Sequence, residues 1–143
     1  MKPNQIEIEF DYSLIRPPGL PLKTFGGTSS GPGPLIELHK LIRELMYRRA
    51  GFRINSRDIV DIMNYIGKCV IAGNIRRVAE IALGGAFDKE FISLKDYEKN
   101  PDRASFGWVS NNSIFAELGM DYSDIAEKIR INGEPGLCWL DNM

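Results

Sequence analysis

The sequence has little of what metal-binding and disulfide-stabilised proteins need. Its 143 residues include two cysteines, Cys69 and Cys138, and one histidine, His39. The cysteines form no C-x-x-C pair, so we expect neither a zinc site nor a disulfide framework and interpret both as buried, reduced thiols. His39 lies in a stretch of helical apolar periodicity, which favours a packing or surface role. With so few soft ligands, no protein-built metal site is predicted.

The chain also lacks an excess of basic charge and any long apolar run. Its formal net charge is −1, with 26% charged and 43% hydrophobic residues. This balance argues against general binding to nucleic acid or to a membrane surface, which normally requires a basic excess. No apolar run approaches the roughly 20 residues of a membrane span, and no signal-type segment follows the N-terminus. We therefore expect one globular, cytoplasmic domain.

What the sequence does contain, near its start, is a long segment rich in glycine and proline. Ten of the 22 residues in 13–34 are Gly or Pro, which excludes a regular element there. The run Gly26-Gly27-Thr28-Ser29-Ser30-Gly31 offers backbone N–H groups and three hydroxyls close to a helix start, where anions are favoured. It lacks the spacing of a P-loop. From these residues alone, a ligand-binding loop and a structural turn are equally supported.

Around this loop, apolar periodicity predicts alternating strands and helices. A strand of alternating apolar and acidic residues is expected over 5–12, and a first helix begins at Pro34 and ends near Arg49. A second helix begins with Ser56 as its N-cap, carries an apolar stripe, and ends near Gly73. Later elements are a strand at 78–83, a short helix or turn at 88–99, strand ends at 108–117 interrupted by two asparagines, a helix at 123–131 closed by Gly133, and a strand at 137–140. The predicted class is α/β.

Two further polar segments are candidates for ligand binding. Arg76 and Arg77 follow Asn74 between two predicted buried elements, so they are either solvated loop charges or contacts to a phosphate or base edge. The segment Ser-Asn-Asn-Ser-Ile at 110–114 is either a turn or a polar cluster at the carboxyl end of a strand, where α/β proteins bind ligands. Neither signal is specific by itself.

In their order along the chain, these segments resemble one family, the adenosylcobalamin-dependent (class II) ribonucleotide reductases. The matching text is RPPGLPLKTFGGTSSGPGPL, GKCVIAGNIRRVAEIALG, FISLKD, WVSNNSI and NGEPG, which together extend from about Asp11 to about Leu140. The resemblance implies that residues 1–143 are a single segment of the catalytic barrel. That segment would be a half-barrel of the ten-stranded α/β type, which needs a partner segment to complete it.

The resemblance also implies roles for particular residues. Residues 16–31 would be the first specificity loop and residues 72–79 the second, and these loops connect the identity of a deoxynucleotide effector to the choice of substrate. The implied specificity-loop residues are Lys23, Gly26, Gly27, Asn74, Ile75, Arg76 and Arg77. The implied substrate-binding residues are Thr28, Ser29, Ser30, Asn111, Asn112 and Ser113.

The sequence departs from the family in what it lacks. It has no Asn-Pro-Cys-Gly-Glu loop to carry the radical cysteine, and neither Cys69 nor Cys138 matches a catalytic position. The resemblance therefore implies a natural split subunit, an intein-separated piece or an engineered fragment. Its partners would be a complementary reductase polypeptide that binds most of the adenosylcobalamin, the substrate and effector nucleotides, and a dithiol reductant such as thioredoxin. The alternative is a non-catalytic nucleotide-binding regulatory module built from the same barrel.

Overall fold

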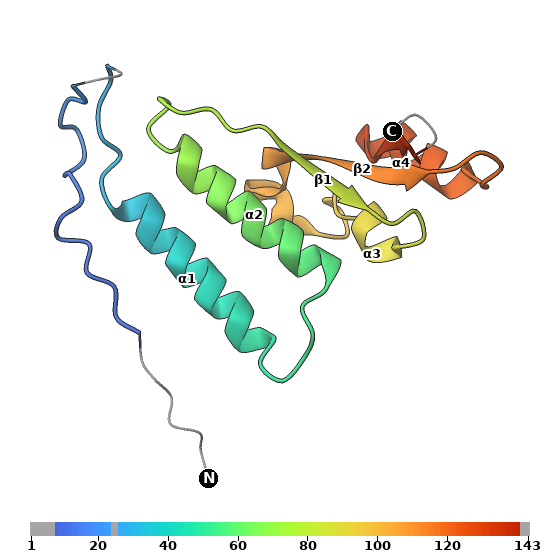
Figure 1. Ribbon diagram of the computed structural model, residues 1–143, viewed down its shortest axis with the longest axis horizontal. Helices are drawn as coiled ribbons and strands as arrows, with labels where there is room; N and C mark the ends of the chain where they lie inside the picture. Colours follow the sequence, from blue (N-terminus) through green and yellow to red (C-terminus); the bar gives the residue numbers. More distant parts are fainter. Residues whose placement is uncertain (1–7, 24–25, 141–143) are drawn as a thin grey trace, which may run out of the picture.

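The computed structural model describes residues 8–23 and 26–140 (Figure 1). Four α-helices, two short 3₁₀ helices and three strands follow one another in these ranges. In chain order they are α1 (Gly33–Arg48), α2 (Ser56–Ile71), β1 (Glu80–Gly84), α3 (Lys89–Ile92), η1 (Pro101–Ser105), η2 (Gly107–Val109), β2 (Ser110–Ala116), α4 (Ser123–Asn132) and β3 (Gly136–Trp139).

Helices α1 and α2 form an antiparallel pair that lies side by side (Figure 1). Apolar residues of α1 at spacings of three and four pack around the buried side chains of Leu45, Tyr65 and Phe106. The N-cap of α2 is Asn55 rather than the predicted Ser56. The Asn55 side chain accepts a hydrogen bond from the backbone N–H of Asp58, whose carboxylate accepts one from Asn55 N in return. The bounds of both helices are thus close to their predictions.

The three strands form a parallel sheet in the order β1-β2-β3. Each crossover carries helices, and α2, α3 and α4 contribute to one core on the same face of the sheet. This core contains Val60, Phe91, Leu94, Ile114 and Ile125. The predicted α/β class is confirmed. Three parallel strands are consistent with part of a larger barrel, whereas the half-barrel and its ten strands stay predictions.

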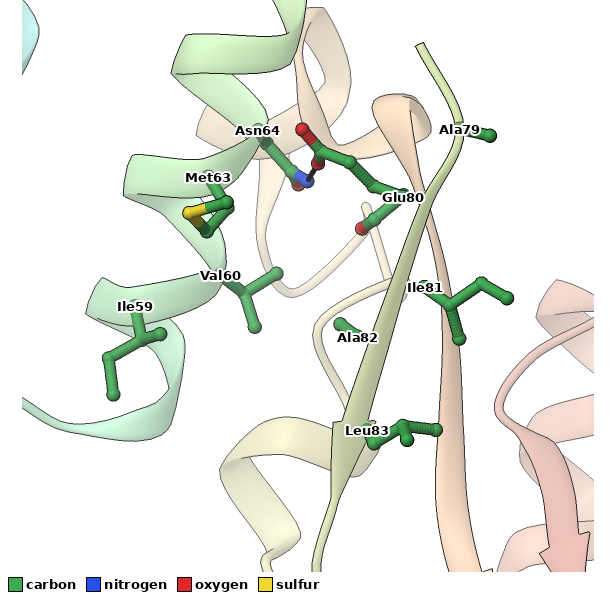
Figure 2. A pocket seen from close by; sticks show the side chains of 10 residues that line it. Ile59, Val60, Met63, Asn64, Ala79, Glu80, Ile81, Ala82 and Leu83 are labelled. Atoms are coloured by element: carbon green, nitrogen blue, oxygen red, sulfur yellow. Dashed lines mark hydrogen bonds between the residues drawn. The ribbon is translucent and has the colours of Figure 1, made fainter.

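Side chains of β1 and β2 alternate between the helix-covered face and the opposite face. On the opposite face, Ile81 pairs in register with Asn111, and Leu83 with Ser113. Ile81 is 72% exposed and Leu83 46% exposed, and both point away from α2 in Figure 2. We call the surface formed by these four residues the open face of the sheet.

Two predictions about strands were wrong. Residues 8–12 form no strand, because none of the described strands lies beside this segment to pair with it; instead Phe10 stacks on His39 of α1 with ring centroids 4.1 Å apart. Residues 5–7 of the predicted strand lie outside the described residues. Strand β2 runs without a break through Asn111 and Asn112, because side chains from elsewhere bind the backbone beside them.

Candidate functional site

The first loop, residues 16–31, folds back on itself. Gly19 N donates to Ser29 O at 2.9 Å, and Ser29 N donates to Leu20 O at 2.8 Å. The Ser29 hydroxyl donates to Arg16 O at 3.0 Å and accepts from Gly31 N at 3.1 Å, so it stabilises the loop itself. These four hydrogen bonds hold the described part of the loop, whose Leu20 is 48% exposed.

The second loop, residues 72–79, begins with a sharp turn after α2. Gly73 has a φ of 91° and Asn74 a φ of 59°, and Asn74 is the one non-glycine residue with positive φ among the described residues. Asparagine tolerates this left-handed conformation better than most residues. The turn leaves the side chain of Ile75 partly buried, whereas Arg76 and Arg77 are exposed.

The structure brings the two loops into contact, although more than 40 residues separate them in the sequence. A Cβ atom placed on Gly27 would lie 3.0 Å from both Cγ1 and Cδ1 of Ile75. A Cβ atom placed on Gly73 would lie 3.4 Å from Ser30 Cβ and 3.7 Å from Thr28 O. Both glycines have positive φ, so each has a steric and a conformational reason to be glycine. Three exposed residues belong to the first loop: Lys23, Thr28 and Ser30.

The asparagine cluster lies at the amino-terminal end of β2, not at the carboxyl end expected from the sequence. The structure also divides the cluster between two faces. Asn111 is exposed and Ser113 half-buried on the open face, whereas Asn112 is buried on the helix side. The Ser110 hydroxyl donates to Asn112 Oδ1 at 2.8 Å. Asn112 Nδ2 is buried and has no hydrogen-bond partner within the described part of the chain.

A buried ionic network, missed by sequence reasoning, connects α2 to the end of the second loop. Arg103 is fully buried and donates from Nε to Asp61 Oδ1 at 2.6 Å, from Nη2 to Asn64 Oδ1 at 3.2 Å, and from Nη1 to the carbonyl oxygen of Leu94. Asn64 Nδ2 in turn donates to Glu80 Oε2 at 3.0 Å, as Figure 2 shows. Burial raises the pKa of Asp61, and the hydrogen bond from Arg103 opposes that shift.

The signal for this network was the placement of Asp61 and Asn64 beside the apolar stripe of α2. The helix buries the side that carries them, whereas three apolar residues of the same helix are half-exposed: Ile59, Met63 and Val70. Ile59 and Met63 line a cleft of about 420 Å³ between α2 and β1 (Figure 2). Within the described part of the chain, β1 pairs with β2 alone, so this cleft borders an unpaired strand edge.

The described residues offer no protein-built metal site. Nδ1 of the single histidine, His39, is 2.8 Å from the Tyr12 hydroxyl, and its ring stacks on Phe10. Cys69 and Cys138 are separate, partly buried thiols. No group of three or more His, Cys, Asp or Glu residues among the described ones is arranged to hold a metal ion. Nor does the described region contain a helix with the length and apolar character needed to cross a bilayer.

Comparison with known proteins connects these features to one family. The chain is 63% identical over 137 residues to an adenosylcobalamin-dependent ribonucleoside-triphosphate reductase of Euglena gracilis. The aligned region covers 96% of this chain and 19% of the relative. It is 60% identical over 134 residues to a probable enzyme of the same name from Dictyostelium discoideum, an alignment that covers 94% of this chain and 18% of the relative. It is 47% identical over 133 residues to the enzyme from Lactobacillus leichmannii, an alignment that covers 92% of this chain and 18% of the relative. No protein-family model and no solved structure matches the chain.

These matches identify the chain as homologous to one segment of the ribonucleotide reductases. The homologues are, more narrowly, the adenosylcobalamin-dependent ribonucleoside-triphosphate reductases, and the family resemblance seen in the sequence is confirmed. The chain spans about a fifth of the length of the curated relatives that it matches.

Proposed function

We propose that this chain is the nucleotide-discriminating part of a ribonucleotide reductase, an enzyme that converts ribonucleotides to deoxyribonucleotides for DNA synthesis. In this proposal the loops at 16–31 and 72–79 are its specificity loops. The observation that carries the proposal is the contact between them, at Gly27 with Ile75 and at Gly73 with Ser30. Because the two loops are in contact, a ligand bound at one loop can change the conformation of the other loop, provided that this ligand favours one arrangement of the contact.

The chemistry of the exposed side chains agrees with a nucleotide ligand. Arg76 and Arg77 present guanidinium groups, which bind phosphate with paired hydrogen bonds. Thr28 and Ser30 offer hydroxyls in the first loop, which approaches the second loop at Gly73. On the open face, Asn111 and Ser113 offer an amide and a hydroxyl that are suited to orient a substrate. Asn112, which is buried on the other face, would support this surface rather than contact the substrate.

A complementary reductase polypeptide would complete the site. The unpaired edge of β1, the apolar cleft beside it and the exposed Ile81 and Leu83 are features that soluble domains normally cover. In the proposal, the complementary polypeptide supplies the radical cysteine and most of the adenosylcobalamin site, and the cofactor supplies the radical that starts reduction. An external dithiol such as thioredoxin restores the reduced enzyme.

A hybrid enzyme tests this function. This chain would replace the matching segment of the 63% identical Euglena relative, and reduction of each ribonucleotide would be measured with and without deoxynucleotide effectors. Gly27→Ala and Gly26→Ala form a matched pair, because both positions have positive φ but only a Cβ on Gly27 meets Ile75. We expect the hybrid to be active, and Gly27→Ala to weaken the effector response several-fold more than Gly26→Ala does.

Two outcomes would contradict the proposal. One is a hybrid that folds but reduces no ribonucleotide. The other is an active hybrid whose effector response is the same in both glycine variants. Titration of deoxynucleoside triphosphates against the 143-residue chain separates the alternative, since micromolar binding without any partner would support an independent regulatory module.

A further inference from the structure

Three segments that carry the family resemblance meet at the start of β2. Lys95, from the segment FISLKD, donates from Nζ to the carbonyl oxygen of Ser110, and its Nζ lies 3.4 Å from Glu134 Oε1. Glu134, from the segment NGEPG, accepts a hydrogen bond through Oε2 from the backbone N–H of Asn112 at 2.8 Å. Ser110 and Asn112 belong to WVSNNSI. One ion pair therefore connects these three segments.

The two backbone groups that this ion pair binds are the ones on either side of Asn111. The carbonyl of Ser110 belongs to the peptide group that precedes Asn111, and the N–H of Asn112 belongs to the one that follows it. Strand β3 begins to pair with β2 only at Ser113, opposite Gly136. Lys95 and Glu134 thus satisfy backbone groups of β2 where β3 does not yet do so.

The ion pair is well shielded from solvent, which makes a purely stabilising role a weak explanation. The side chain of Lys95 is 9% exposed and that of Glu134 21% exposed. Removing two charges from water offsets much of their attraction, so a pair of apolar residues often stabilises such a site equally well. What apolar residues do not offer is a donor for one peptide group and an acceptor for the next. The match of each charge to its backbone partner favours a role in fixing geometry.

We infer that Lys95 and Glu134 are positioning residues for Asn111: they hold its backbone so that its amide presents to the nucleotide on the open face. This inference rests on the proposed function, because it takes Asn111 as a substrate contact. It adds that the affinity for substrate depends on two residues that bind the backbone of β2 and do not touch the nucleotide.

A double-mutant cycle in the hybrid enzyme tests the inference. The variants are Glu134→Ala, Asn111→Ala and both together, and the readout is KM for the ribonucleotide, with kcat recorded alongside. We expect Glu134→Ala to raise KM about tenfold when Asn111 is present and less than about twofold when Asn111 is already alanine. Glu134→Gln retains an acceptor for Asn112 N–H, so it should restore most of the affinity. Arg130→Met is the control, since it breaks an ion pair of 2.6 Å, to Glu127, whose two residues both belong to α4.

The outcomes separate this inference from the proposed function. Suppose that the hybrid is active, that Asn111→Ala raises KM, and that Glu134→Ala raises KM by the same factor with or without Asn111. This result would overturn the positioning role alone. An active hybrid in which Asn111→Ala changes nothing would overturn the substrate contact and the positioning role with it. Should Glu134→Ala fail to fold, Lys95→Met takes its place in the same cycle, with the same expected loss and the same refutation.

Discussion

Replacement of Arg103 by methionine should cost this domain a large part of its stability. The guanidinium is fully buried and binds Asp61, Asn64 and the carbonyl of Leu94, and its central carbon lies 5.7 Å from the ring centroid of Phe106. Methionine retains the apolar contacts and removes the donors. Asp61 then keeps a buried charge whose remaining cation is Arg57, at 3.5 Å.

The size of the loss follows from the unpaired charge. Breaking a buried ion pair by removing one partner costs about 3–5 kcal/mol. Because Arg57 still compensates part of the Asp61 charge, we expect Arg103→Met to lower the free energy of unfolding by about 3 kcal/mol, out of a total of about 5–15 kcal/mol for a typical domain. The double variant Arg103→Met with Asp61→Leu should lose less than the single one, because it leaves no buried charge.

The pH dependence gives the test its direction. Burial already raises the pKa of Asp61 above the ordinary 3.8, and removal of Arg103 should raise it further. A group with a raised pKa takes up its proton first in the folded state, so the penalty of the unpaired carboxylate is present above that pKa and shrinks as the pH falls through it. Relative to the wild type, Arg103→Met should therefore lose less stability at acid pH than at neutral pH.

Urea unfolding of both proteins, followed by circular dichroism across this pH range, measures the difference. The reasoning would be refuted by a loss below about 1 kcal/mol at neutral pH, the range of an exposed ion pair. A loss that stays constant with pH would refute it as well, because it would show that Asp61 carries no unpaired charge in the variant.

Three further predictions concern single sites. Asn111→Leu in the hybrid enzyme should weaken substrate binding by about 1–3 kcal/mol, measured through KM, and an unchanged KM would exclude Asn111 as a ligand contact. Gly84→Ala should lower the free energy of unfolding by about 1–3 kcal/mol, because its Cβ would lie 2.3–2.5 Å from ring atoms of Phe91. Gly85→Ala serves as the control, since its Cβ meets no atom within 4 Å. Burial lowers the pKa of Lys95 from the ordinary 10.5, so the unfolded chain binds this proton more tightly than the folded chain does. The free energy of unfolding should therefore rise as the pH approaches 10.5. A Lys95→Met variant that shows the same rise would contradict this prediction.

The helices were predictable because their signals are local. Apolar spacing in α1 and a left-handed Gly133 closing α4 depend on neighbours within one or two turns. The capping of α2 was missed by one residue for a comparable reason, since Asn55 and Ser56 are both good N-caps and only the geometry chooses between them.

Strands and buried polar residues were harder to predict because their partners are distant in the sequence. Residues 8–12 have the alternation of a strand, but none of the strands in the described part of the chain pairs with them. Asn111 and Asn112 were expected to interrupt a strand, yet Glu134, more than 20 residues away, accepts a hydrogen bond from the backbone of this segment, which is extended. Arg103 gave no local sign that it would be the most deeply buried cation, because its three acceptors come from other elements.

By itself, the sequence determined the α/β class, the two long helices, the two glycine-bearing loops and the reductase family, because short-range periodicity and motif order carry that information. The tertiary structure alone decided which of those segments meet. It places Gly27 against Ile75, separates Asn111 from Asn112 across the sheet, and brings Lys95 and Glu134 to the backbone of β2. The physical reason is that contacts between distant segments depend on how the sheet and helices pack together, which no local pattern specifies.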